Sequence, residues 1–148
     1  NVEKKSLYLL LKKYTPSDTW SSFVHTIIAE MTDKSGRFSY SSIAQLYIWE
    51  ETWANLFEIV KQNATLDTLD SYASYLMKNY ANELSELYKT AILNYSEYHM
   101  GRDSYIRICT YLRKLKKMGA SEKANFIIRQ LKSLYPKRKA LMEELDKL

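Results

Sequence analysis

The chain is poor in cysteine, glycine and proline, and each shortage excludes a class of protein. Its 148 residues include one cysteine, three glycines and two prolines. A single cysteine excludes an internal disulfide framework and any zinc site built from several cysteines. A sheet protein of this length needs many tight turns, which use glycine and proline. The sequence therefore predicts long helices joined by few loops, in a reducing compartment such as the cytoplasm.

Long apolar runs are absent as well. No stretch approaches the run of about 18 apolar residues that a membrane-spanning helix needs, so no membrane association is expected. The apolar segment from Leu7 to Leu11 is short, and it is followed by lysines instead of a small-residue cleavage site, which is unlike a signal peptide. The chain has no initiator methionine and begins almost inside a predicted helix. We therefore expect it to be a fragment of a longer protein.

Apolar residues at helical spacing are the main positive signal. They recur at i, i+3, i+4 and i+7 and predict about nine helices of roughly 10 to 20 residues. The clearest loop is expected at residues 33 to 37. One apolar stripe ends at Met77 and another begins at Leu84, which predicts a break between two helices. Two further stripes are expected to face the core: Leu7, Leu10, Leu11 and Tyr14 near the N-terminus, and Tyr105, Ile108, Cys109, Leu112 and Leu115.

A repeated pattern suggests how the helices are arranged. The series Trp20-x-x-Phe23-Val24-x-x-Ile27 returns 33 residues later, starting at Trp53. That spacing is typical of helix-turn-helix repeats of the tetratricopeptide kind. Short loops also make neighbouring helices antiparallel. The predicted fold is all-α, with one domain over residues 1–148. Its antiparallel helical hairpins are stacked as a tetratricopeptide-like α-solenoid or form an irregular helical bundle.

Positive charge is concentrated in the C-terminal half. The net charge of the whole chain is +5, but residues 1–74 sum to −2 and residues 75–148 to +7. Residues 102–139 contain 12 Lys and Arg against Asp103 and Glu122. A local basic block of this kind is what an electrostatic binding surface requires. The candidate basic surface consists of nine residues: Arg107, Arg113, Lys114, Lys117, Arg129, Lys132, Lys137, Arg138 and Lys139.

Three interpretations of this basic block are open. On the predicted helix at 102–118, Arg107, Lys114 and Lys117 lie opposite the apolar stripe and must face water or a ligand. A solvated helix face is favoured, because lysines in a last helical turn also stabilise the helix dipole. Contact with a protein ranks second, and contact with a nucleic acid ranks third.

No group of residues indicates catalysis or metal binding. His25 and His99 each lack a second ligand at metal-binding spacing. Cys109 lies on an apolar stripe and is expected to be a buried small hydrophobe. The glutamate pairs at 50–51 and 143–144 are adjacent on a helix, so their side chains point about 100° apart and cannot act as a facing acid and base. We therefore expect no catalytic residues, no cofactor and no metal, and a protein that is not an enzyme.

From residue 43 onward, two patterns point to a known family. The first is Arg102-x-x-Tyr105 followed by Leu112-x-x-Leu115, and the second is Tyr135-x-x-Arg138-x-Ala140-Leu141-x-x-Glu144-Leu145. This region resembles the C-terminal helical region of bacterial SWIM zinc-finger proteins. The zinc motif of that family, Cys-x-Cys followed by Cys-x-His, is missing here. The resemblance implies nucleic-acid or protein binding for the family, but it attaches that role to the zinc finger.

These observations predict a non-catalytic helical-repeat interaction module that binds a protein partner. The chain contains 13 tyrosines, and this amphipathic side chain suits peptide capture on a helical surface. The resemblance implies that the module is the C-terminal part of a SWIM zinc-finger-like protein. The alternative is an auxiliary nucleic-acid-binding surface formed by residues 102–139. The sequence does not identify the partner or the oligomeric state.

Overall fold

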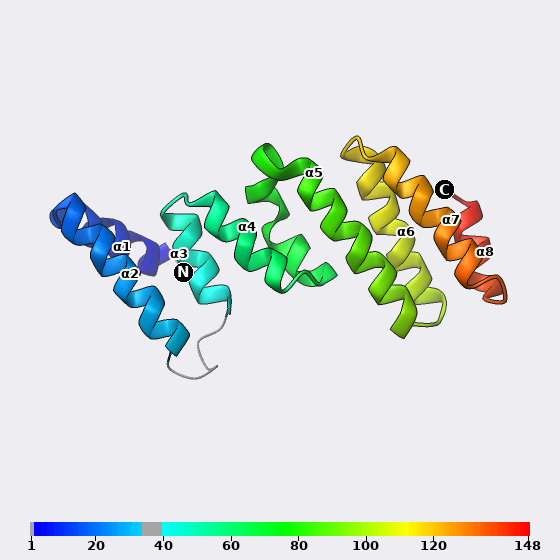
Figure 1. Ribbon diagram of the computed structural model, residues 1–148, viewed down its shortest axis with the longest axis horizontal. Coiled ribbons are helices and arrows are strands. Elements are labelled where there is room, and N and C mark those ends of the chain that lie inside the picture. Colours follow the sequence, from blue (N-terminus) through cyan, green and yellow to red (C-terminus); the bar gives the residue numbers. More distant parts are fainter. Residues whose placement is uncertain (1, 34–39) are drawn as a thin grey trace. The chain divides into compact units, whose positions relative to one another are not determined.

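The computed structural model describes residues 2–33 and 40–148, and this part of the chain is helical without strands (Figure 1). The all-α prediction is confirmed. The loop predicted at 33–37 lies, from residue 34 onward, outside the described residues. The described residues form eight helices: α1 Val2–Tyr14, α2 Ser17–Asp33, α3 Tyr40–Trp49, α4 Trp53–Gln62, α5 Leu66–Tyr98, α6 Arg102–Lys117, α7 Ser121–Leu134 and α8 Lys139–Asp146.

The chain divides into two compact units, Asn1–Ile59 (unit 1) and Val60–Leu148 (unit 2). Each unit has its own buried apolar residues, as the next paragraphs describe. The expectation of a single domain stays a prediction, as does the tetratricopeptide-like form of the helical array. None of the helices in residues 2–33 and 40–148 combines the length and apolarity that a membrane crossing requires.

The core of unit 1 is built on aromatic rings. Tyr8 of α1 packs its ring against Trp20 of α2 and Trp49 of α3, with ring centroids 5.1 and 4.8 Å apart. Val24 and Leu46 complete the buried cluster. Large rings bury much area per residue, so a few of them can close a small core.

The apolar face predicted for the first helix is wrong. Leu7, Leu10, Leu11 and Tyr14 are half exposed or more, whereas Tyr8 is the buried residue of α1. Three consecutive leucines, at 9 to 11, spread apolar side chains around the helix and do not select one side. The Tyr8 ring selects the side instead, because it fits between two tryptophans and its hydroxyl donates a hydrogen bond to Glu50.

Glu50, just after α3, joins α1 and α2 through one carboxylate. Its Oε1 accepts hydrogen bonds from the Tyr8 hydroxyl and from Trp20 Nε1, the latter at 3.0 Å. Lys12 Nζ lies 3.1 Å from Oε2. Burial alone would raise the pKa of Glu50, but the hydrogen bonds from Tyr8, Trp20 and Lys12 outweigh it and leave that pKa lowered.

Unit 2 has a tighter aliphatic core. Of the twelve largest fully buried side chains in the described residues, eleven belong to unit 2, and Leu56 is the other. The stripe predicted for α6 is confirmed, because Tyr105, Ile108, Cys109, Leu112 and Leu115 are all buried. Helix α6 packs against α5, α7 and α8, so it is the central helix of this unit.

Helix α5 contains a reversal at Tyr80, whose φ of −131° and ψ of 31° are not helical. A contact across the reversal shows its extent: the Tyr88 hydroxyl lies 3.2 Å from Asp70 Oδ1. Eighteen residues of straight helix would span about 27 Å, so the chain turns back at Tyr80, as Figure 1 shows. α5 thus has a first arm (residues 66–79) and a second arm (residues 81–98). The break predicted between Met77 and Leu84 is confirmed, and the arms bring the described helical segments to nine.

Two glycines make the next reversals of unit 2. Gly101 joins α5 to α6 with a φ of 105°, and Gly119 joins α6 to α7 with a φ of 82°. Side chains other than glycine rarely adopt positive φ without strain. These turns set α6 antiparallel to the second arm of α5 and α7 antiparallel to α6 (Figure 1).

Candidate functional site

Helix α6, both arms of α5 and the two residues before α5 line a groove with two open cavities. The larger, about 550 Å³, is lined by Asp70, Asp103, Ile106, Arg107, Thr110, Tyr111 and Lys114. The smaller, about 370 Å³, is lined by Ala64, Thr65, Leu66, Asp67, Ala91, Asn94, Tyr95, His99 and Arg107. Arg107 lines both, so the two cavities meet at its side chain. We call this surface the α5–α6 groove.

Asp70 is the polar centre of the α5–α6 groove. Its carboxylate accepts hydrogen bonds from the hydroxyls of Tyr88 and Tyr111. Lys114 Nζ donates a third bond, 2.9 Å from Asp70 Oδ1, and lies 5.2 Å from the centroid of the Tyr88 ring. The reversal of α5 brings Tyr88 to this carboxylate, and α6 supplies the other two donors. One side chain on the first arm therefore ties together three helical segments.

Arg107 forms the second crossing of the groove. Its Nη2 lies 2.6 Å from Asp67 Oδ1. The guanidinium also lies over two rings, 5.1 Å from the centroid of Tyr95 and 5.8 Å from that of Tyr111. Stacking on aromatic rings holds an arginine in one orientation. The Asp67 side chain is 86% exposed, so this ion pair is open to solvent and to a competing ligand.

The charges of the groove are stable at neutral pH. Burial alone would raise the pKa of Asp70, but hydrogen bonds from Tyr111 and Lys114 outweigh it, and that pKa is lowered. Burial would likewise lower the pKa of Lys114, but Asp70 and Tyr88 outweigh it, and that pKa is raised. A carboxylate of lowered pKa is a weak base and a lysine of raised pKa is a weak acid. These groups suit fixed electrostatic contacts better than proton transfer.

Four of the nine candidate basic residues are held by partners within the chain. Arg107 and Lys114 bind Asp67 and Asp70, as described. Lys132 of α7 lies 2.6 Å from Asp146. Arg138 donates to the Ser96 carbonyl oxygen at 2.6 Å and stacks over Tyr135. These cations have structural contacts, which the sequence did not reveal.

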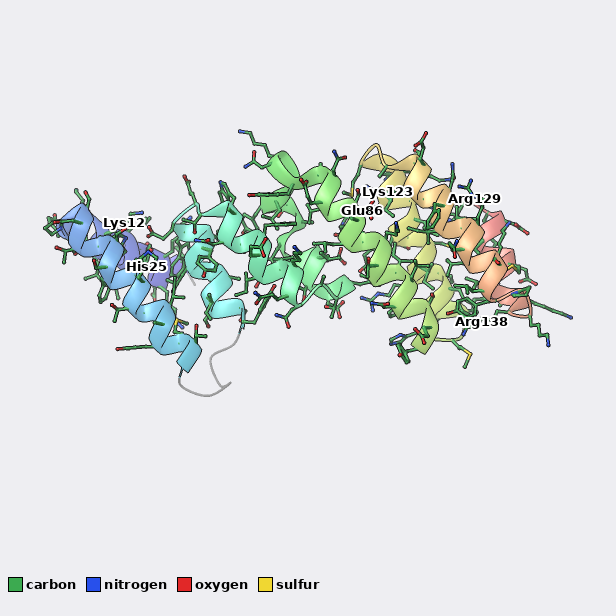
Figure 2. All side chains as sticks on the ribbon, in the orientation of Figure 1. Lys12, His25, Glu86, Lys123, Arg129 and Arg138 are labelled. Carbon is green, nitrogen blue, oxygen red and sulfur yellow. The ribbon has the colours of Figure 1, made fainter. Side chains whose placement is uncertain are left out.

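The side chains of the other five candidates form no hydrogen bond or ion pair within residues 2–33 and 40–148; these candidates are Arg113, Lys117, Arg129, Lys137 and Lys139. Two of them lie on α6, one lies on α7, and two lie at or beside the start of α8. Figure 2 shows Arg129 along α7 and Arg138 at the far end of that helix. A single binding surface formed by all nine residues stays a prediction.

Sequence reasoning did not single out the acidic half of the groove. Asp67 and Asp70 are spaced i, i+3 on the first arm, and Arg107 and Lys114 are spaced i, i+7 on α6. Both spacings place the charges on one helical face. That complementary spacing was the available signal, but using it requires knowing that the two segments are neighbours.

A serine–lysine pair lies where the second arm of α5 meets the start of α7. Lys123 Nζ is 2.7 Å from Ser85 Oγ, beside a cavity of about 400 Å³. Such pairs serve as nucleophile and base in some hydrolases, where the lysine must be neutral. Here Lys123 Nζ also lies 3.0 Å from Glu86 Oε1 and forms an ion pair with it (Figure 2). Ser85 in turn donates to the carbonyl oxygen of Asn82. The pair joins α5 to α7.

The remaining candidate residues have ordinary environments. His25 is exposed on α2 (Figure 2). His99 stacks on Tyr95 with ring centroids 3.9 Å apart. Cys109 is buried, as expected, and burial raises the pKa of its thiol. Within the described ranges, no three His, Cys, Asp or Glu side chains form a group that could hold a metal ion.

The residues that carry the family resemblance have packing roles in unit 2. Arg102 binds Glu143 at 2.6 Å and Glu144 at 2.7 Å, which fastens α6 to α8. Leu141 and Leu145 are buried beside them. Comparison of the chain with protein-family models, with curated proteins and with solved structures finds no match. The SWIM zinc-finger resemblance therefore stays a prediction.

Proposed function

We propose that the chain is a non-catalytic helical module that binds a protein partner through the α5–α6 groove. The observation that carries this proposal is an open groove on packed helices, in which charged groups, tyrosine rings and the partly exposed Ile106 lie together. Protein contact surfaces combine aromatic, arginine and apolar side chains in this way. The ion pairs of Arg107 and Lys114 hold the groove in shape, which lowers the entropy cost of binding.

A steric variant tests this proposal. The partner is captured from a lysate of the source organism, identified, purified, and titrated against the chain by calorimetry. Thr110→Trp adds a large ring at an exposed position that lines the groove. We expect binding to weaken by about tenfold or more. Asn125→Trp, at an exposed position of α7, is the matched control and should bind like the unmodified chain. Equal affinities for all three proteins would refute the proposal.

Family membership and location belong to the same proposal. We place the chain in the C-terminal region of SWIM zinc-finger-like proteins and in the cytoplasm, on the strength of the two quoted patterns and the single cysteine. Proteins that carry both patterns should also carry Cys-x-Cys followed by Cys-x-His. Collecting such sequences and finding no zinc motif among them would contradict the family proposal.

An auxiliary nucleic-acid-binding surface is the second candidate. The five unpaired cations support it. If about four cations reach phosphates, the logarithm of the binding constant should fall against log salt with a slope of roughly −3.6. Because Lys114 is tied to Asp70, the informative substitution is Arg113→Gln with Lys117→Gln, which should flatten the slope by nearly two units. We expect weak binding at about 150 mM salt. Submicromolar binding that the double variant abolishes would make this the leading function.

A further inference from the structure

We infer that the exposed face of α6 binds an acidic segment of the partner that also carries an apolar side chain. This inference rests on the proposed function, since it specifies the chemistry of the partner at the α5–α6 groove. It is based on three observations. Four exposed residues form a row on α6, some cations near the groove are ion-paired whereas others are not, and carboxylates line the groove.

Four residues make a continuous ridge on α6: Ile106, Thr110, Arg113 and Lys117. Their spacings of four, three and four residues place them on one helical face. All four are exposed, and Ile106 keeps 45% of its surface in solvent. The ridge is apolar at its N-terminal end, where Ile106 and Thr110 line the larger cavity. It is cationic at its C-terminal end. We call it the α6 ridge.

The two cations of the α6 ridge are free to meet a ligand. Arg107 and Lys114 each lie next in sequence to a ridge residue, on the neighbouring face of α6, and they already form ion pairs with Asp67 and Asp70. The side chains of Arg113 and Lys117 have no hydrogen bond or ion pair to any described residue. Lys117 lies in the last turn of α6, where a cation favours the helix dipole. The dipole does not account for Arg113, which lies a turn earlier.

Charge favours an acidic partner over a neutral one. Residues 60–148 contain 16 Lys and Arg and 10 Asp and Glu, a balance of +6. A surplus of this size accelerates the approach of an acidic partner. Guanidinium and ammonium groups bind carboxylates with charge-assisted hydrogen bonds.

The same groove disfavours a nucleic acid. A phosphate backbone is uniformly anionic along its length. It would meet three carboxylates here, because Asp67, Asp70 and Asp103 all line the two cavities. A protein segment can place acidic residues against Arg113 and Lys117 and an apolar one beside Ile106. Only the protein segment matches the ridge at both ends.

A synthetic probe tests the inference without a known partner. The probe is a fluorescent helical peptide of about 16 residues, a length near the minimum for a stable helix. It has leucines at one end of a face and glutamates at the other, and a second peptide replaces each glutamate by glutamine. Anisotropy titration should show the acidic peptide binding at least tenfold more tightly. Ile106→Ser should weaken its binding several-fold.

Paired charge variants show whether the ridge is responsible. Arg113→Gln with Lys117→Gln should weaken binding of the acidic peptide about tenfold. Arg129→Gln with Lys139→Gln removes the same charge from exposed positions on α7 and α8, and should change binding less than twofold. If both double variants lose the same affinity for the acidic peptide, net charge alone explains the binding and the inference is overturned. Circular dichroism should show equal helicity in every variant.

Two further outcomes separate this inference from the proposed function. Duplex DNA binding more tightly than the acidic peptide at equal salt would overturn the inference in favour of a nucleic acid. A purified partner whose binding is lost in Thr110→Trp but unchanged in the Arg113 and Lys117 double variant would also overturn it, while the proposed function would stand. Loss of partner binding in both variants, with retention in the Arg129 and Lys139 pair, would support both.

Discussion

At the scale of single residues, two carboxylates organise the polar contacts of the two units. Glu50 in unit 1 accepts hydrogen bonds from Tyr8, Trp20 and Lys12. Asp70 in unit 2 accepts them from two tyrosines and a lysine. Several of the chain's many tyrosines thus donate a hydrogen bond from a long side chain to a carboxylate on another segment of the chain. Tyrosine suits this task because its ring is buried while its hydroxyl stays bonded.

Replacing Asp70 tests how much its contacts contribute. Asp70→Asn keeps the size of the side chain but removes the charge that Tyr88, Tyr111 and Lys114 share. We expect the free energy of unfolding to fall by about 1 kcal/mol, because partial exposure screens the ion pair. Asp67→Asn is the control, since that side chain is mostly in solvent; its effect should stay within about 0.5 kcal/mol. Urea unfolding followed by circular dichroism measures both, and equal losses would contradict the ranking.

The pKa of Glu50 predicts how unit 1 responds to acid. Folding lowers this pKa below its usual value of 4.5. Between the folded and unfolded values, the unfolded chain binds more protons, so stability is full above pH 4.5 and is lost as the pH falls. We expect tryptophan fluorescence to show Glu50→Gln as less stable at neutral pH and less sensitive to acid. Glu58→Gln, exposed on α4, should keep the original acid sensitivity. An unchanged pH profile in Glu50→Gln would count against this role.

At the scale of helices, the start of α5 depends on Thr65. The Thr65 hydroxyl accepts a hydrogen bond from the Thr68 backbone N–H at 3.2 Å and so caps the first arm of the groove. Thr65→Ala should destabilise unit 2 by about 1 kcal/mol, whereas Thr65→Ser, which keeps the hydroxyl, should cost only a few tenths. Far-ultraviolet circular dichroism during urea unfolding measures both. Equal stability of the two variants would show that the cap contributes little.

The helices were predictable where the apolar pattern chose one face. The stripe of α6 was correct at all five positions because Arg107, Thr110 and Arg113 interrupt the apolar residues about once per helical turn. The face of α1 was wrong because the leucines at 9 to 11 leave the choice to Tyr8 and its tryptophan neighbours. The reversal near Tyr80 was predicted as a break, but the sequence did not show that the second arm returns alongside the first. That return depends on contacts between distant residues.

At the scale of the whole molecule, only the basic side of the groove could be predicted from the sequence. The basic side came from local charge on α6. Its acidic side did not, because Asp67 and Asp70 lie about 40 residues away from their partners in sequence. Long-range ion pairs have no local signal, so the sequence overcounted the cations available to a ligand. Arg107 and Lys114 are fixed, whereas Arg113 and Lys117 remain available.

The two units should differ in stability. The three tryptophans, at positions 20, 49 and 53, all belong to unit 1, whereas most helical residues belong to unit 2. Unit 2 also holds nearly all of the large, fully buried side chains. Tryptophan fluorescence should therefore change at lower urea than far-ultraviolet circular dichroism. Coincident transitions would instead support the single domain expected from the sequence.

Because Cys109 is buried, the rate at which its thiol is alkylated can report how often unit 2 opens. This thiol is the only one in the sequence, and it lies on the buried face of α6, in the core of unit 2. An alkylating reagent can reach it only when the helices around it separate. The rate of labelling in native buffer therefore counts openings of unit 2, with no engineered probe. A partner that binds the groove stabilises the folded form of unit 2. It should therefore lower the rate of Cys109 alkylation, even if it touches no residue near the sulfur.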